Sequence, residues 1–310
     1  MAEKIATREA YGNALAEFGA KYENLVVLDA DLAAATKTST FKKAFPDRFF
    51  DCGIAENNMI NVAVGLSLSG KIPFASTFAM FAAGRSYEQI RNSIGYPHTN
   101  VKIGATHAGI TVGEDGATHQ CNEDLALMRT IPGMTILNPA DAVEARLAVE
   151  AAIKMQGPCY LRFGRMAVPV IFDKDYKFEI GRGVKLADGT DVSLIATGIE
   201  VEQALAAREL LAAEGISASV INIHTIKPLD EDLVVAEAQK TGAIVTCEEH
   251  SIIGGLGEAV CAVLSEKLPT PVKRIGVNDE FGHSGPAVDL LKQFGLCAEH
   301  IVEVAKEFCK

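Results

Sequence analysis

Short apolar runs alternate with amphipathic stretches along almost the whole chain. In the first half, short, mainly apolar runs predict strands at 25–28, 72–74, 101–104, 134–137 and 159–163. Apolar positions at helical spacing predict helices at 56–69, 81–94 and 140–154. Such an alternation is typical of a mostly parallel sheet with helices on both faces.

A polar segment at 173–177 interrupts this pattern, and a second alternating unit follows it. Apolar runs predict strands at 192–196, 220–223, 243–246 and 272–275, and the first helix of this unit stops at Gly215. We therefore expect an α/β chain of two doubly wound, mostly parallel-sheet domains, at 1–170 and 189–310, with a linker at 171–188. Ligands of such sheets bind at the carboxyl ends of the strands.

Composition narrows the class of protein. The chain has 310 residues, of which 48% are hydrophobic and 22% charged, as in soluble globular proteins. Its net charge of −11 argues against nucleic acid and anionic membranes as partners. No apolar stretch reaches the ~18 residues that span a bilayer. The first residues lack a basic-then-apolar signal region, so we expect a cytoplasmic protein.

The seven cysteines are scattered and form no CxxC pair. This spacing argues against zinc and iron–sulfur sites, and we expect no metal ligands on this chain. The cysteines are typical of reduced, buried residues in a cytosolic protein.

The stretch 106–120 carries the densest candidate chemistry. It follows a predicted strand and holds three glycines, which let a backbone approach a ligand closely. It also holds His107, His119, Glu114 and Asp115, and imidazoles bind anions or move protons near neutral pH. The alternative is a solvated glycine-rich turn. A metal site is less favoured, because no paired histidine spacing occurs here.

Two further segments allow both a structural and a functional interpretation. Glu56 stands at the head of a predicted helix, where a carboxylate commonly complements the helix dipole. Phe78 and Phe81 are three residues apart, a spacing that usually means core packing. Both rings are also suited to stacking on a planar heterocycle.

Arginines and one aspartate complete the candidate set. Arg8, Arg162 and Arg165 are candidate anion binders, since guanidinium matches phosphate geometry, although each alone is more often a surface cation. Asp31 follows the first strand and either contacts a ligand or caps the next turn. The glycines at 254–257 do not form GxGxxG and predict only a tight connection.

Taken together, four motifs resemble the C-terminal part of transketolases, over essentially the whole chain. They are Gly-Ile-Ala-Glu at 53–56, Ser-Thr-Phe at 76–78, His107 with the run 113–120, and Ile-Lys-Pro-Leu-Asp at 226–230. The resemblance implies a pyrimidine-binding domain followed by a transketolase C-terminal domain. It also implies the cofactor thiamine diphosphate (ThDP) and Mg²⁺.

The chain lacks the Gly-Asp-Gly motif with which this family binds the ThDP pyrophosphate. The resemblance therefore implies one subunit of a split enzyme, with the pyrophosphate and Mg²⁺ ligands on a separate N-terminal subunit. An α2β2 heterotetramer acting on sugar phosphates, with no nucleic acid or membrane as partner, is the expected assembly.

The resemblance also implies roles for individual residues, at the positions that match the motifs of the transketolase family. Glu56 corresponds to the glutamate that hydrogen-bonds the aminopyrimidine ring, Phe81 and Phe78 to the aromatics that stack on it, and Asp31 to an aspartate close to the cofactor. The resemblance implies catalytic roles for Glu56, His119 and His107. It implies that substrate is bound by Arg8, His107, Asp115, His119 and Arg165. A phosphate-binding serine of the family falls at Ala35, so that contact passes to Thr36 or Lys37 or is missing.

The expected reaction moves a two-carbon ketol unit from a ketose phosphate to an aldose phosphate. A subunit related to 1-deoxyxylulose-5-phosphate synthase is less favoured, because that family has Gly-Ala-Asp-Gly where this chain has Gly-Glu-Asp-Gly at 113–116. A 2-oxoacid dehydrogenase beta subunit lacks the loop from His107 to His119. A non-catalytic scaffold subunit is the remaining alternative, against which the intact site residues weigh.

Overall fold

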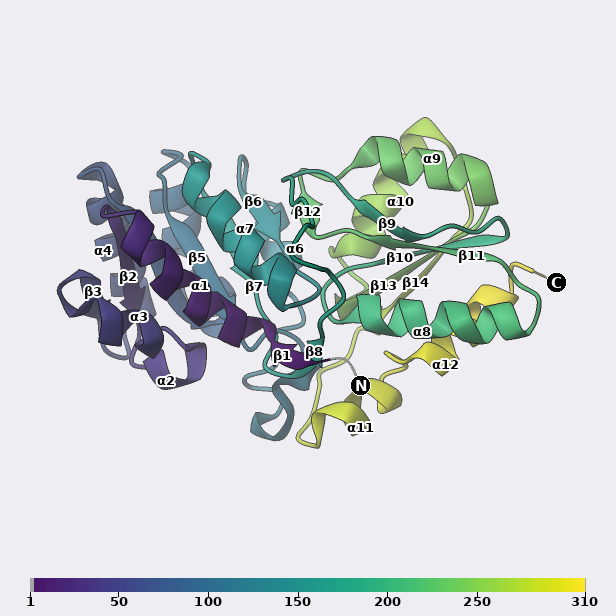
Figure 1. Cartoon of the computed structure of the whole chain (residues 1–310), viewed down its shortest axis with the longest axis horizontal. Helices are drawn as coiled ribbons and strands as arrows, with labels where there is room; N and C mark the ends of the chain where they lie inside the picture. Colours follow the sequence, from purple (N-terminus) through teal and green to yellow (C-terminus); the bar gives the residue numbers. More distant parts are fainter. Residues whose placement is uncertain (1–2, 310) are drawn as a thin grey trace.

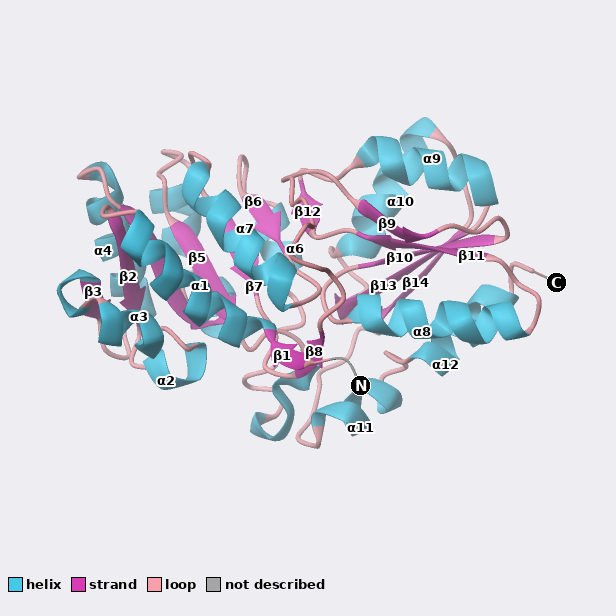
Figure 2. Ribbon diagram, viewed as in Figure 1, coloured by secondary structure: helices cyan, strands magenta, loops and turns pink. Residues whose placement is uncertain are grey.

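Two open sheets lie side by side along the length of the molecule (Figure 1). The structure is a computed structural model and describes residues 3–309. Helices cover both faces of each sheet (Figure 2), as the alternating pattern predicted. The fold is therefore α/β with two doubly wound, mostly parallel domains.

The first sheet has seven strands in the order β12-β6-β7-β5-β4-β2-β3. Its strands are β2 (Leu25–Asp29), β3 (Phe49–Asp51), β4 (Ile72–Phe78), β5 (Lys102–Thr106), β6 (Thr135–Leu137), β7 (Cys159–Arg162) and β12 (Thr225–Lys227). All neighbours run parallel except β12, which pairs antiparallel with β6. The segment 225–227 was not expected to be a strand, and it comes from the second half of the chain.

The second sheet has five strands in the order β14-β13-β10-β11-β9. They are β9 (Val184–Ala187), β10 (Val192–Ala196), β11 (Ala218–Asn222), β13 (Ile244–Ser251) and β14 (Val272–Val277). Only β9 runs antiparallel to its neighbour. A small separate pair joins β1 (Lys4–Ala6) to β8 (Ala167–Pro169).

The helices follow most of the predicted positions. The α-helices are α1 (Thr7–Lys21), α2 (Ala33–Thr36), α3 (Ser39–Ala44), α4 (Glu56–Leu68), α5 (Tyr87–Gln89), α6 (Asp124–Arg129), α7 (Ala142–Lys154), α8 (Glu200–Ala213), α9 (Glu231–Thr241), α10 (Leu256–Lys267), α11 (Ala287–Gln293) and α12 (Ala298–Lys306). Two 3₁₀ segments are η1 (Pro46–Arg48) and η4 (Ile110–Asp115).

The prediction of one regular helix at 81–94 is wrong about the type of helix. Here the chain forms two wide π-helical segments, η2 (Met80–Arg85) and η3 (Ile90–Gly95), on either side of the short α5. A π-helix has i→i+5 hydrogen bonds, so apolar residues on one side look the same in sequence as those of an α-helix.

Alternating side chains of the first sheet fill two different cores. In β2, Leu25 and Val27 belong to the core beneath α1 and α7, whereas Leu28 belongs to the core beneath α4. Tyr11 of α1 is fully buried and stacks on Phe163, with ring centroids 4.5 Å apart. This packing fixes the edge from which the loops after β2, β4 and β5 emerge.

The two domains share a continuous core. One cluster of buried apolar side chains holds Ile136 and Tyr160 of the first sheet together with Ile195 and Ile221 of the second. The connecting segment is also anchored, because the Asp141 carboxylate accepts hydrogen bonds from the N–H groups of residues 171 and 172, at 2.7 and 2.8 Å. The domains are therefore held together by apolar packing and by a polar anchor.

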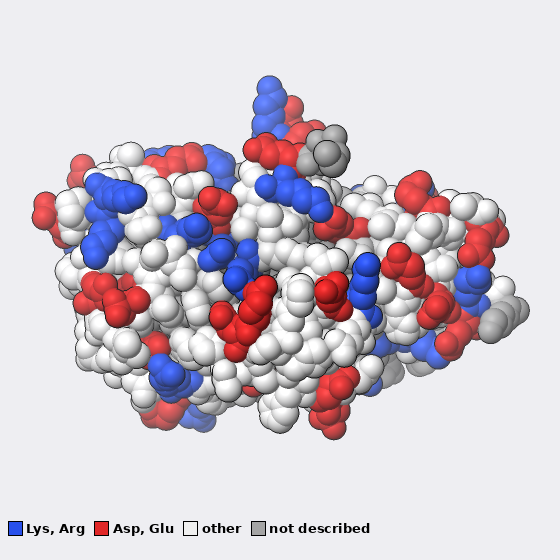
Figure 3. All heavy atoms as spheres, turned by 90° about the horizontal axis from the view of Figure 1, so that it is seen from below, with Lys and Arg blue, Asp and Glu red and all other residues white. Residues whose placement is uncertain are grey.

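Acidic and basic side chains are intermixed on the face shown in Figure 3. That face presents no continuous basic surface among the described residues. Within residues 3–309, no helix has both the length and the apolar character needed to cross a membrane.

Candidate active site

The candidate site lies where β4 and β5 end. The two strands are parallel neighbours, and their last residues, Phe78 and Thr106, lie directly opposite each other. His107 follows at once with a left-handed φ of 55°. This turn brings the imidazole against the Phe78 ring, with centroids 3.8 Å apart and the rings nearly parallel. The carboxyl edge of the sheet is where α/β proteins bind ligands.

Glu56 stands at the first position of α4 and is only 2% exposed. Its two carboxylate oxygens each accept a hydrogen bond from the same nitrogen, Nη1 of Arg85, at 2.8 Å. The Arg85 side chain is 47% exposed, so the pair has one buried and one solvent-facing partner. The sequence analysis missed Arg85, because its contact depends on the wide turn of η2.

Aromatic rings form a continuous group beside Glu56. Phe78 and Phe81 lie almost parallel with centroids 5.7 Å apart, and the His119 ring meets Phe81 edge-on at 5.4 Å. The guanidinium carbon of Arg85 lies 4.4 Å from the Phe81 ring centroid. Four of the predicted site residues, two phenylalanines and two histidines, are therefore in mutual contact.

Three cationic side chains lie near His107: Arg8, Arg165 and Lys37, called the cation group below. Nη1 of Arg8 donates to His107 Nε2 at 3.1 Å and to the carbonyl oxygen of Ala35 at 2.7 Å. Because Nε2 accepts this bond, we assign the proton to Nδ1, which donates to Thr106 Oγ1 at 2.9 Å. Burial is the main cause that lowers the His107 pKa to about 3, and the nearby charges of Arg8, Arg165, His119 and Lys37 act in the same direction. The imidazole is therefore neutral at pH 7.

The missing serine at Ala35 has a structural consequence. Thr36 is fully buried and its hydroxyl donates to the Asp29 carboxylate at 2.7 Å, so Thr36 is already engaged in the protein interior. Lys37, at a left-handed φ of 70°, is close enough to His107 to affect its pKa. Of the two substitutes considered from the sequence, only Lys37 belongs to the cation group.

Buried Asp29, which the sequence analysis did not single out, organises this turn. Its carboxylate accepts hydrogen bonds from the backbone N–H of Leu32 and from the hydroxyls of Thr36 and Thr38. Burial raises the Asp29 pKa to about 6, despite these bonds. No sequence signal distinguishes it from the last residue of any buried strand.

The remaining predicted residues are more exposed. Nη1 of Arg165 donates to Glu114 at 2.8 Å and to the carbonyl oxygen of Val112. Asp115 ends η4 with an exposed side chain. Asp31 is exposed at a φ of 63°, and its backbone N–H donates to Asp51. Within residues 3–309, no contact links the side chains of Asp31 or Asp115 to the ring group.

Arg162 has a structural role and is not an anion binder. It is 3% exposed, and its Nε donates to both Asp124 oxygens, at 2.9 and 3.1 Å. Its Nη2 donates to the carbonyl oxygen of Glu249 at 2.9 Å. The arginine therefore joins β7 to β13 of the second domain and is unavailable to a ligand.

The second domain supports the loop that carries His119. Nε2 of Gln120 donates to the carbonyl oxygens of Ile110, Gly113 and His283, at 3.0–3.2 Å. The buried Glu249 carboxylate accepts a 2.7 Å bond from the Thr111 N–H.

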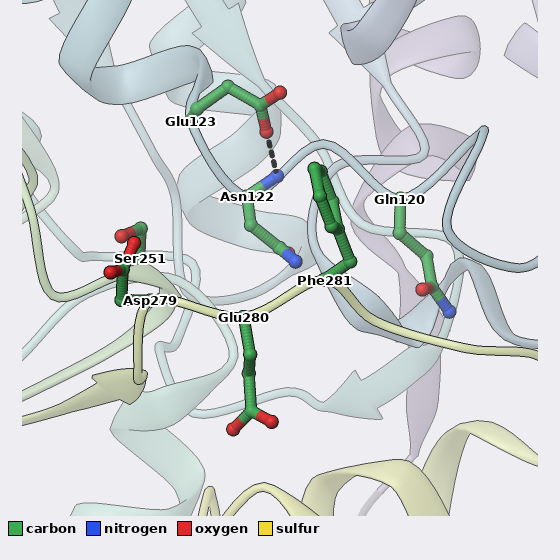
Figure 4. A pocket seen from close by; sticks show the side chains of 7 residues that line it. All are labelled: Gln120, Asn122, Glu123, Ser251, Asp279, Glu280 and Phe281. Atoms are coloured by element: carbon green, nitrogen blue, oxygen red, sulfur yellow. Dashed lines mark hydrogen bonds between the residues drawn. The ribbon is translucent and has the colours of Figure 1, made fainter.

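Beside Gln120 lies an open pocket of about 270 Å³ (Figure 4), lined by Gln120, Asn122, Glu123, Ser251, Asp279, Glu280 and Phe281. None of the residues predicted to bind cofactor or substrate lines this pocket.

The glycines at 254–257 serve the tight connection predicted for them. The Glu248 carboxylate accepts bonds from the backbone N–H groups of Leu256 and Gly257, at 2.6 and 2.8 Å. A carboxylate thus occupies the position in which a dinucleotide loop would bind phosphate.

Comparison with known families decides what kind of protein carries this site. The family model of the transketolase pyrimidine binding domain matches residues 3–170, and that of the transketolase C-terminal domain matches residues 181–301. The chain belongs to the transketolase family. Between them, the two models cover both sheets of this transketolase-family chain.

Related proteins agree with this assignment. A protein of Methanocaldococcus jannaschii named as a transketolase C-terminal section is 50% identical over 98% of this chain and 96% of its own length. A 6-deoxy-6-sulfo-D-fructose transketolase subunit of Clostridium sp. is 44% identical over 97% of this chain and 93% of its own. Rat transketolase is 39% identical, and the match spans 49% of it. This chain is thus similar over nearly its whole length to a transketolase C-terminal section and to about half of a full-length transketolase.

Solved structures show the same fold. A structure titled as a split gene transketolase, inactive beta4 tetramer, matches with a TM-score of 0.92 and 55% identity, over 98% of both chains. Transketolase from Leishmania mexicana matches with a TM-score of 0.83 and 26% identity, and the match covers 99% of this chain and 46% of that one.

Proposed function

We propose that this chain is the C-terminal subunit of a ThDP-dependent split transketolase. The reaction moves a two-carbon ketol unit from a ketose phosphate to an aldose phosphate. The observation that carries the proposal is the pairing of two features at one sheet edge. A buried glutamate beside stacked aromatic rings suits an aminopyrimidine, and the cation group around His107 suits a phosphate.

The residues present fit one half of the cofactor. The slot between Glu56 and Phe81 already accommodates a planar N–H donor, the Arg85 guanidinium. Within residues 3–309, no cluster of three His, Cys, Asp or Glu side chains is arranged to hold a metal ion. The Arg85 contact supports pyrimidine binding by this chain, and the proposal assigns the ligands for Mg²⁺ and pyrophosphate to a partner.

ThDP, when bound, supplies the carbon nucleophile and electron sink for breaking a carbon–carbon bond, and the protein orients the reactants and manages protons. Glu56 would hydrogen-bond the cofactor pyrimidine, and Phe81 and Phe78 would provide aromatic surface for its ring. The proposal assigns exposed Asp31 to a contact with the cofactor at the interface with the partner subunit. The half-buried His119, edge-on to Phe81, moves protons at the substrate oxygens.

The proposal assigns sugar-phosphate binding to the cation group. Arg8, Arg165 and Lys37 hold the phosphate by charge-assisted hydrogen bonds. His107, kept neutral, offers a directional contact without adding a further charge. The exposed Asp115 recognises a hydroxyl group of the donor sugar. Related subunits are named for different sugars, 6-deoxy-6-sulfo-D-fructose and apulose-4-phosphate, so the proposal names a substrate class and leaves the sugar open.

The proposed assembly is a cytoplasmic α2β2 heterotetramer. A relative with 55% identity was solved as an inactive beta4 tetramer, as its title states. That title supports a need for the second subunit, since a complex of C-terminal sections alone would lack the pyrophosphate half of the cofactor site.

The test begins with the native mass of the chain purified from its own cells with ThDP and Mg²⁺. Recovery of a second chain in equal amounts, followed by ThDP-dependent ketol transfer in the reconstituted complex, supports the proposal. Tight, Mg²⁺-dependent ThDP binding by the isolated chain, measured by calorimetry, overturns the split-subunit assignment. A partnered complex that binds no ThDP and turns over no ketose phosphate favours the scaffold alternative.

A further inference from the structure

The proposed function leaves the role of Arg85 unassigned. Its guanidinium makes two contacts with residues that the proposal gives to the cofactor. It lies over the Phe81 ring at 4.4 Å, and it donates from Nη1 to both oxygens of Glu56. A guanidinium is planar, rich in N–H groups and suited to stacking on aromatic rings. These are the properties by which an aminopyrimidine is recognised in the same slot.

The two occupants exclude each other. Nη1 lies 2.8 Å from each Glu56 oxygen, and that carboxylate is 2% exposed, which leaves little room for a second donor. A pyrimidine stacked on the same face of Phe81 would also meet the guanidinium. Binding of one group therefore requires departure of the other.

We infer that Arg85 is a latch that occupies the pyrimidine slot and is displaced when the cofactor binds. The inference rests on the proposed function and deepens it, because it makes Arg85 a determinant of cofactor affinity. With Arg85 in the slot, Glu56 keeps a hydrogen-bonding partner before the cofactor arrives. A buried carboxylate without one is strongly unfavourable.

The local structure allows this exchange. Arg85 is the last residue of η2, four positions after Phe81, so both side chains fall on one side of the wide π turn. Its side chain is 47% exposed, and the guanidinium reaches solvent by rotation of its own torsions. The buried residues of η2, Ala82 and Ala83, need not move. When the cofactor replaces it, Glu56 exchanges one N–H donor for another.

The test measures the dissociation constant of ThDP by calorimetry, at fixed Mg²⁺, in the complex of the full chain with its N-terminal subunit. If the latch is closed about ten times as often as it is open, Arg85→Ala tightens ThDP binding about tenfold. Arg85→Lys keeps the charge but loses the planar group, and we expect a smaller gain. Arg91→Ala is the matched control, since the exposed Arg91 side chain donates to its neighbour Asn92, and it should leave the constant unchanged.

Several results would overturn the latch. Unchanged or weaker ThDP binding in Arg85→Ala does so, as does a structure of the cofactor-bound complex in which the guanidinium still lies between Glu56 and Phe81. If Arg85→Ala fails to fold, Arg85→Gln, which keeps one amide donor but no charge, replaces it with the same expected direction. A wild-type complex that binds no ThDP contradicts the proposed function itself, whereas normal binding that is insensitive to Arg85 contradicts only the latch.

Discussion

At the scale of single residues, the site depends on a few groups whose environment sets their chemical state. Glu56 is buried at a helix start with one arginine as partner, and His107 is buried among cations. The environment of each side chain therefore combines burial with specific charged neighbours.

Replacing Glu56 tests the cofactor assignment. We expect Glu56→Ala to reduce ketol transfer by the reconstituted complex at least a hundredfold, because the pyrimidine loses its hydrogen-bond acceptor. The thermal unfolding midpoint should change little, since Arg85 is half-exposed and can turn to water. Glu209→Gln, on an exposed part of α8, is the control and should retain full activity. Full activity in Glu56→Ala would contradict the assignment.

His107 should make stability depend on pH. Its pKa in the folded chain is about 3, below the value of about 6.5 expected in the unfolded chain, so between these values the unfolded state binds more protons. Stability from this group is therefore present above about pH 6.5 and is lost as the pH falls toward 3. We expect His107→Gln to flatten the dependence of the unfolding free energy on pH between 6.5 and 4.

Chemical denaturation at a series of pH values measures this slope. Part of the slope should remain in the variant, because burial also lowers the pKa values of His224 and His250 to about 4. An unchanged slope in His107→Gln would show that its imidazole is not held neutral.

At the scale of elements, the sheet edge was predictable and several of its contacts were not. Short, mainly apolar runs identified β2, β5 and β7, so the stretch 106–120 was correctly expected at the end of a strand. The π segments η2 and η3 could not be predicted, since their apolar spacing resembles that of an ordinary helix. The contact of Arg85 with Glu56 depends on this geometry and was missed for the same reason.

The contact between α1 and the turn after α2 offers a test at this scale. A Cβ atom on Gly12 would lie 2.3 Å from the carbonyl oxygen of Lys37, so Gly12→Ala must displace this turn. We expect a several-fold rise in KM for the sugar phosphate with a smaller change in kcat, because the displaced Lys37 belongs to the cation group. Gly65→Ala in α4, where a Cβ atom meets nothing within 4 Å, is the control for stability. Unchanged KM in Gly12→Ala would remove Lys37 from the phosphate site.

At the scale of the whole molecule, the second domain contributes directly to the first. Gln120 binds the carbonyl oxygen of His283, Glu249 binds the Thr111 N–H, and Arg162 reaches β13. The polar segment at 173–177, the second alternating unit and the resemblance to transketolases allowed two domains to be predicted. The contacts between the two domains could not be predicted, because a contact between distant segments leaves no periodic pattern in the sequence of either segment.

The ion pair of Arg162 with Asp124 lies within the first domain, next to the bond that Arg162 makes with Glu249 of the second, and its contribution to stability can be tested. Both side chains are buried, and removal of one partner from such a pair typically costs about 3–5 kcal/mol. We expect Arg162→Met alone to lower the unfolding free energy by an amount in that range. The double variant with Asp124→Leu should recover a large part of the loss, since no unpaired buried charge remains. Equal destabilisation in the single and double variants, measured by denaturant titration, would contradict this account.

The antiparallel strand β12 also bears on where such a protein can be divided. Thr225–Lys227 lies beyond the second domain's strand β11 in sequence, yet it closes the edge of the first sheet at β6. A cut anywhere between 171 and 224 would expose the β6 edge and leave β12 on the wrong fragment. For gene fission or for the design of modular enzymes, a division within 171–224 therefore separates two strands of one sheet.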